Sequence, residues 1–142
     1  MIGEMPESGK PDTTEHRSAS IIAFIQRNAI RSWLELGPEV EVLLVGEEAG
    51  LAEIAAELGI KHLPDVRRNS EGTPLVSSIF ELARQNSQSP FLAYVNADII
   101  VMPDFLDSTR AVATTTARFL IVGQRWDLDV RDLLDYSTGW QL

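Results

Sequence analysis

The feature that most constrains the fold is an alternation of two apolar patterns along the chain. Residues 18–36 repeat apolar side chains at helical spacing and stop at a Gly-Pro pair, whereas residues 40–45 form a short run that becomes fully apolar. Further helical patterns and apolar runs then alternate, with helices predicted at 51–58, 74–86 and 103–115 and strands at 60–63, 90–95 and 119–122. Because helices supply the crossovers that parallel strands need, this order predicts an α/β fold with a mostly parallel sheet.

The apolar runs are nearly continuous, which is typical of strands covered on both faces. The sequence therefore predicts a sheet between two helical layers, a Rossmann-like three-layer sandwich. A chain of 142 residues is long enough for one such domain, expected over residues 18–142. Residues 1–17 are expected to be a flexible tail or a degenerate first strand. Only residues 1–5 could form the central strand that usually precedes the first helix, so the expected sheet is incomplete at this end.

Composition excludes several classes of function. Twelve Lys and Arg against 21 Asp and Glu give a formal net charge of −9, which repels nucleic acids. The absence of cysteine excludes disulfides and thiolate catalysis. There is no apolar run long enough to span a membrane and no secretory signal at the start, so a cytoplasmic location is expected. The sequence leaves homo-oligomerisation open.

The strongest candidate site is Asn96-Ala97-Asp98, directly after the apolar run 90–95. Ligands of open parallel sheets bind outside the carboxyl ends of the strands. Residues two apart in an extended chain point the same way, so Asn96 and Asp98 could converge on one hard cation, Mn²⁺ or Mg²⁺. The alternative is that Asp98 caps a turn and Asn96 bonds to backbone.

Two other loops follow predicted strands. Residues 65–74 carry two arginines and approach a helix expected to have Thr73 as its N-cap and Pro74 in its first turn, an environment that suits a phosphate or a base. The alternative is a solvated connection. Gly46 would allow close approach of a ligand to the backbone, and Glu47 could contact a base or a ribose hydroxyl.

The last candidate loop, residues 123–129, follows the run 119–122. It combines Arg125, Trp126 and two acidic residues, which suit contacts with a sugar or a nucleotide. Alternatively, Trp126 packs against the sheet and Arg125 pairs with Asp127 or Asp129.

Taken in order, these segments resemble the GT-A-like nucleotide-diphospho-sugar transferases. The resemblance extends over roughly residues 21–130 and rests on five segments, Ile25-Gln26-Arg27-Asn28-Ala29-Ile30-Arg31-Ser32-Trp33, Val45-Gly46-Glu47, residues 69–74, Tyr94-Val95-Asn96-Ala97-Asp98-Ile99 and Val122-Gly123-Gln124-Arg125-Trp126-Asp127. In GT-A glycosyltransferases an Asp-x-Asp motif binds the divalent ion that bridges the donor diphosphate. Asn96-Ala97-Asp98 resembles that motif, with Asn in place of the first Asp.

The resemblance implies a glycosyltransferase that binds a nucleotide-sugar donor and an acceptor of unknown identity. It implies a divalent metal, Mn²⁺ or Mg²⁺, held by Asp98 and Asn96. The residues it implies for donor binding are Gln26, Arg27, Gly46, Glu47, Arg68, Asn69, Gly72, Thr73, Asn96 and Arg125. No catalytic base is identified, because the acceptor half of the family would lie beyond Leu142. The alternatives are a sugar-phosphate nucleotidyltransferase and a degenerate interaction domain of the same fold.

Overall fold

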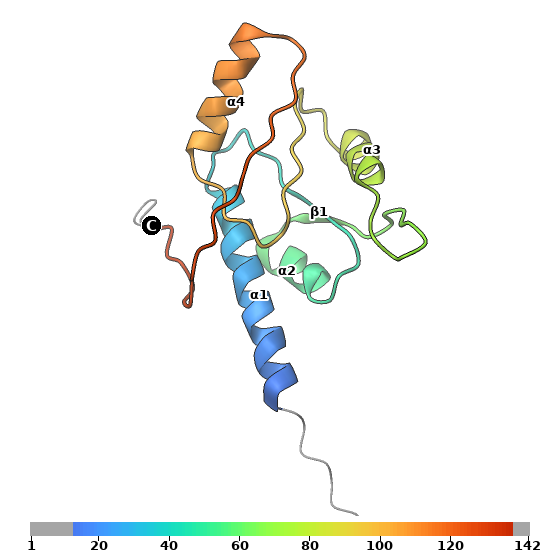
Figure 1. Ribbon diagram of the computed structural model, residues 1–142, viewed down its shortest axis with the longest axis vertical. Helices are drawn as coiled ribbons and strands as arrows, with labels where there is room; N and C mark the ends of the chain where they lie inside the picture. Colours follow the sequence, from blue (N-terminus) through green and yellow to red (C-terminus); the bar gives the residue numbers. More distant parts are fainter. Residues whose placement is uncertain (1–12, 138–142) are drawn as a thin grey trace, which may run out of the picture.

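The fold is known from a computed structural model, which describes residues 13–137, with side chains from residue 21 onward. A long helix leads into a small sheet, and two further helices follow (Figure 1). The elements in chain order are α1 (Thr13–Leu34), β1 (Leu43–Val45), α2 (Leu51–Leu58), β2 (Lys61–Leu63), α3 (Val76–Asn86) and α4 (Asp104–Thr115).

The sheet consists of β1 and β2, paired in parallel with α2 as the crossover between them. Leu44 lies opposite His62 at the centre of the register. The crossover ends at Gly59, whose φ of +66° is readily adopted only by glycine and whose N–H caps the helix by donating to Ala55. The predicted α/β class and the parallel pairing of the first two strands are therefore confirmed.

The core lies where α1 packs against this β1-α2-β2 unit. Its fully buried apolar side chains are Ile30, Leu44, Leu51, Ile54 and Ala55, and Trp33, Val42, Leu58 and Ile60 pack around them. Burial of each large apolar side chain contributes roughly 1.5–3 kcal/mol before entropy is counted. The hydrophobic stabilisation of the fold is therefore concentrated in residues 29–60.

The predicted strands 90–95 and 119–122 are not strands in the structure. Both segments run through the upper half of the molecule without helix or ladder (Figure 1), and the rings of Phe91 and Phe119 approach to 5.2 Å between centroids. Apart from the turn that Asn96 closes with Ile99, no described backbone hydrogen bond joins either segment to a neighbour. The apolar pattern predicted strands here, but a strand also needs a partner at ladder distance, and the described chain provides none.

Polar side chains on the buried face of α1 form hydrogen bonds to the backbone of segments that have no strand partner. Asn28 is only 1% exposed, and its side-chain amide donates to the Asp132 carbonyl at 3.0 Å and accepts from the Leu134 N–H at 2.9 Å. Ser32 accepts from the Val101 N–H, and the Trp33 indole donates to the Ile99 carbonyl. The helix thus holds two distant segments by hydrogen bonds to their backbones.

Two predicted helix starts differ from the structure. The first helix begins at Thr13, so residues 13–17, expected to lie in the tail, are helical. The third begins at Val76 with Leu75 at its N-cap, rather than at Pro74 after a Thr73 cap. Its buried side chain is Ser78, which accepts from the Arg67 N–H, while Val76 is half exposed.

The expected first strand at residues 1–5 lies outside the described residues. None of the helices within residues 13–137 combines the length and apolarity of a membrane-spanning helix.

Candidate functional site

The carboxyl ends of β1 and β2 meet at one edge, and Gly46 lies at their junction. Its N–H donates to the Leu63 carbonyl at 3.0 Å, and its own carbonyl lies 2.7 Å from Nε2 of His62. Gly46 is buried and has a φ of +125°, a conformation that strains any residue with a Cβ. Glycine is therefore required here by the backbone itself.

Arg68 links the two loops that leave this edge. Its guanidinium forms an ion pair with Glu48 at 3.0 Å and donates to the Gly72 carbonyl at 2.8 Å. Glu48, the neighbour of the predicted donor-binding residue Glu47, is therefore the acidic residue that links the two loops. Arg68 and Glu48 are 20 residues apart in the sequence, so no local pattern could have predicted their pairing. The parallel register of β1 and β2 brings them together.

The loop of residues 67–75 is closed around Asn69. Its side-chain oxygen accepts from the N–H groups of Glu71 and Thr73, at 3.0 and 2.8 Å, and Gly72 takes the left-handed φ of +82° that completes the turn. The Asn69 carboxamide oxygen is thus used in the fold, which agrees with the solvated-connection alternative. The side-chain N–H₂ of Asn69 and the hydroxyl of Thr73 have no described partner and remain available to a ligand.

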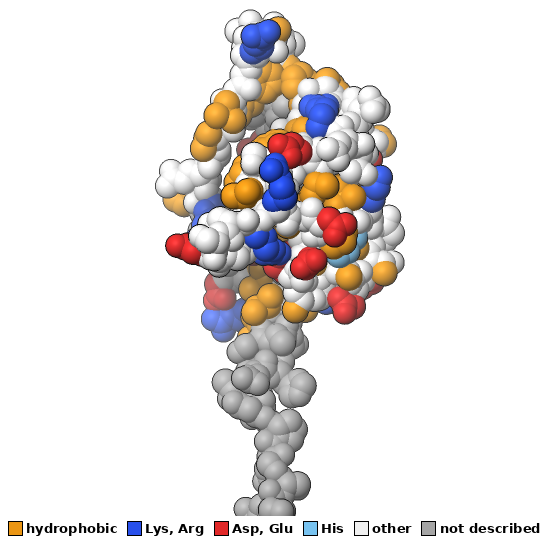
Figure 2. Space-filling view, turned by 90° about the vertical axis from the view of Figure 1, so that its right-hand side faces the viewer, with side chains coloured by type: hydrophobic (Ala, Val, Ile, Leu, Met, Phe, Trp, Pro, Cys, Tyr) orange, Lys and Arg blue, Asp and Glu red, His pale blue; other side chains and the backbone are white. Residues whose placement is uncertain are grey.

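The face that carries α3 and this loop is mixed in charge. Figure 2 shows acidic and basic side chains interspersed over it, without a broad patch of one sign. Arg67 there pairs with Glu81 at 2.6 Å and Arg68 with Glu48, which limits the positive charge that a phosphate would meet.

The Asn96-Ala97-Asp98 motif lies in an exposed turn. The Asn96 carbonyl accepts from the Ile99 N–H at 3.0 Å, and its side-chain oxygen accepts from the Tyr94 hydroxyl at 2.7 Å. Because Ala97 and Asp98 turn rather than continue extended, the alternation expected to aim Asn96 and Asp98 together does not apply. The Asp98 carboxylate is exposed and has no partner among residues 13–137.

The ligand set at this turn is small. No group of three His, Cys, Asp or Glu side chains that could hold a metal occurs within the described residues. One free carboxylate with a neighbouring amide oxygen fits Mg²⁺ or Mn²⁺ only where water and phosphate oxygens complete the coordination. The residues fit a metal that arrives with a diphosphate better than a resident ion.

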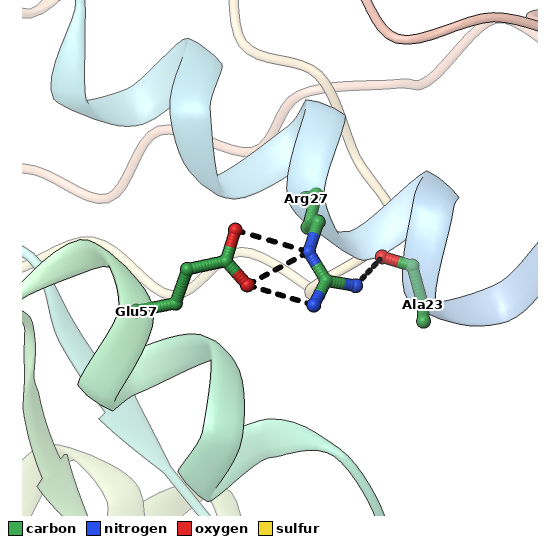
Figure 3. A network of polar contacts seen from close by, with 3 residues as sticks. All are labelled: Ala23, Arg27 and Glu57. Carbon is green, nitrogen blue, oxygen red and sulfur yellow. Dashed lines mark hydrogen bonds and ion pairs between the residues drawn. The ribbon is translucent and has the colours of Figure 1, made fainter. Parts of the chain in front are cut away.

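The two donor-binding residues predicted on α1, Arg27 and Gln26, differ in their contacts. Arg27 forms a bidentate contact with Glu57 of α2, with a shortest distance of 2.7 Å, and also donates to the Ala23 carbonyl (Figure 3). The hydrogen bond from Arg27 lowers the pKa of Glu57, and the same pairing raises the pKa of Arg27. Gln26 differs, because its buried side-chain oxygen has no hydrogen-bond partner in the described part of the chain.

The segment after residue 122 does not show the packing and ion pairing that were the alternative to ligand contacts. Trp126 is 93% exposed and does not pack against the sheet, and Asp129 pairs with Arg131 rather than Arg125. Arg125 is exposed and has no ion-pair partner among the described residues.

The fold therefore brings only some of the predicted donor-binding residues together at the edge of the sheet. Six of the residues lie in the two loops at the sheet edge: Gly46, Glu47, Arg68, Asn69, Gly72 and Thr73. No described contact joins them to Gln26, Asn96, Asp98 or Arg125. A shallow cleft of about 520 Å³ lies elsewhere, between α1, the end of α2 and residues 134–137, and none of its lining residues was predicted.

Comparison of the chain with protein-family models, with curated proteins and with solved structures returns no match.

Proposed function

We propose that the chain is a donor-binding domain of glycosyltransferase type, which binds a nucleotide-diphospho-sugar at the carboxyl edge of its parallel strands. One observation carries the proposal. The parallel register of β1 and β2 joins the Gly46 turn and the 67–75 loop through Arg68 and Glu48 at the edge where open α/β sheets bind ligands.

In this proposal each group at the edge has a separate task. Gly46 has no Cβ, and the Glu48 carboxylate lies where a Cβ would stand, so that Glu48 and its partner Arg68 come close to the backbone of this turn. Arg68 directs the N–H groups not used by Glu48 and Gly72 toward the diphosphate, and Glu48 keeps the guanidinium in place. Gln26 lies on α1 rather than at the edge, and its unpartnered oxygen would accept a hydrogen bond from a base or hydroxyl group of the donor.

Asp98, assisted by Asn96, would hold the divalent ion together with the diphosphate oxygens. When bound, the ion supplies Lewis-acid stabilisation of the charge on the departing nucleoside diphosphate. Tyr94 orients the Asn96 carboxamide through its hydrogen bond.

Titration calorimetry with UDP and with GDP, each with and without Mn²⁺, tests the proposal. We expect binding that requires Mn²⁺ and that weakens at least about tenfold in Asp98→Asn, a factor that corresponds to about 1.4 kcal/mol. Asp104→Asn is the matched control, since Asp104, the first residue of α4, is also an exposed carboxylate without a described partner. Absence of binding to either nucleotide, or equal binding by both variants, would refute the proposal.

A second candidate function is that of a non-catalytic interaction domain. It is favoured by the apolar side chains that the fold leaves exposed between residues 91 and 128. The calorimetric experiment separates the two, because an interaction domain binds no nucleotide and is insensitive to the loss of Asp98.

A further inference from the structure

Residues 120–128 place large apolar side chains at alternate positions, and these side chains are exposed rather than packed in the core. The exposed fractions of Leu120, Val122, Trp126 and Leu128 are 86%, 83%, 93% and 61%. Gln124 shares their side at the centre of the segment, and Ile121, at 44%, Arg125 and Asp127 point to the other side. Because alternate residues of an extended chain share a side, the four most exposed side chains define one apolar face, which we call the 120–128 face.

The backbone of this segment also lacks hydrogen-bond partners among the described residues. No backbone amide between residues 119 and 131 donates to another described backbone group. An extended segment with free N–H and C=O groups and an apolar face is a template for pairing with another strand. Exposure of several large apolar side chains together is typical of an interaction surface.

The segment is also held at both ends, so that pairing would order little further chain. Phe119 contacts Phe91 on one side of it, and the Asn28 amide binds the backbone at residues 132 and 134 on the other. An anchored segment loses less conformational entropy on binding than a free one.

Charge indicates which partner fits. The whole chain carries a net charge of −9, so two copies repel over most of their surfaces. Residues 118–131 depart from this negative balance, because three arginines stand there against two aspartates, a net charge of +1. Two copies that meet through this segment therefore avoid bringing net negative surfaces together.

The residue pattern also indicates a register. If the segment pairs antiparallel with its own copy about a two-fold axis at Gln124, Leu120 faces Leu128 of the partner subunit and Val122 faces Trp126 of the partner subunit. No like charges then lie directly opposite. Centring on Gly123 would instead place Val122 opposite a glutamine, and centring on Val122 would place Trp126 opposite an arginine.

The geometry points to a homodimer formed by antiparallel strand pairing of the 120–128 face, with Gln124 on the two-fold axis. Such an interface is isologous, since each copy contributes the same segment. Cross-strand apolar and aromatic pairs are the units that stabilise such a sheet. The inference does not depend on nucleotide binding, because none of the four side chains on this face belongs to the proposed donor site.

Sedimentation analysis measures the oligomeric state. We expect the mass to rise toward about twice the 15.7 kDa of one chain as its concentration increases from about 1 to about 300 µM. Val122→Lys should remain monomeric over that range, since it places a charge in the apolar face. Ser108→Lys, which adds the same charge at an exposed position of α4, should dimerise as the unmodified chain does.

A disulfide test checks the register. The chain has no cysteine, so Gln124→Cys introduces one thiol per copy, and directly opposed residues of an antiparallel pair lie within disulfide distance. We expect Gln124→Cys to form covalent dimers under mild oxidation much faster than Ser108→Cys. A monomeric chain, a dimer that survives Val122→Lys, or equal crosslinking of the two cysteine variants would overturn the inference.

Discussion

Asn28 shows how one side chain can decide the course of a distant segment. An asparagine on the buried face of a helix is unfavourable unless its amide is satisfied, and here both its groups bond to the backbone near residues 132 and 134. The Asn28 carbonyl also accepts from the Tyr136 hydroxyl at 3.0 Å. The burial of this residue is thus coupled to the docking of residues 132–136.

We expect Asn28→Ala to lower the free energy of unfolding by about 2–3 kcal/mol, because two hydrogen bonds to a buried amide are lost. Urea denaturation followed by circular dichroism measures the change. Gln85→Ala, at an exposed position of α3, is the control and should change stability by less than about 0.5 kcal/mol. Equal effects of the two substitutions would show that the Asn28 contacts contribute nothing to stability.

At the scale of elements, α1 and α2 are joined by apolar packing and by the Arg27–Glu57 ion pair (Figure 3). The two side chains are partly exposed, so solvent screens the pair and its contribution is small compared with that of the core. Its value as a probe lies in its pH dependence, because the folded-state pKa of Glu57 is lowered by Arg27.

A carboxyl group whose pKa is lowered on folding stabilises the protein above its unfolded-state pKa, near 4.5, and loses that contribution as pH falls through the folded-state value. We therefore expect the urea midpoint of the unmodified chain to exceed that of Glu57→Gln at pH 7. The difference should shrink as pH falls below about 4.5. Equal urea midpoints of the unmodified chain and Glu57→Gln at pH 7 would contradict this expectation.

For the whole molecule, stability is distributed unevenly. The packed unit of α1, β1, α2 and β2 holds most of the buried apolar side chains, whereas residues 119–131 are exposed and without backbone hydrogen bonds. Regions with few buried contacts open at lower free energy than the core.

Hydrogen exchange read by mass spectrometry should reveal this division. We expect slow exchange in residues 43–63 and fast exchange in residues 119–131 of the monomeric Val122→Lys variant. In the unmodified chain at dimer-forming concentration, residues 120–128 should become protected as strand pairing occupies their N–H groups. Equal protection of residues 120–128 in both proteins would contradict the proposed interface.

The sequence by itself determined the local elements and their order. Apolar spacing, together with Gly and Pro at the ends of elements, located the four helices and two strands found within residues 13–137, because these signals depend on residues close together along the chain. The Gly46 turn was located for the same reason. The role of Glu48 and the ends of α1 were missed, since neither carries a local signal that distinguishes it from its neighbours.

Only the tertiary structure decided which extended segments become strands and which candidate residues meet. The runs 90–95 and 119–122 have the composition of strands, yet pairing depends on a neighbour that local pattern does not encode. The register of β1 and β2 places Arg68 beside Glu48. Side chains of α1 form hydrogen bonds to the backbone of four residues in distant segments, Ile99, Val101, Asp132 and Leu134. These are contacts between residues far apart in the chain, and their geometry exists only once the helix has packed on the sheet.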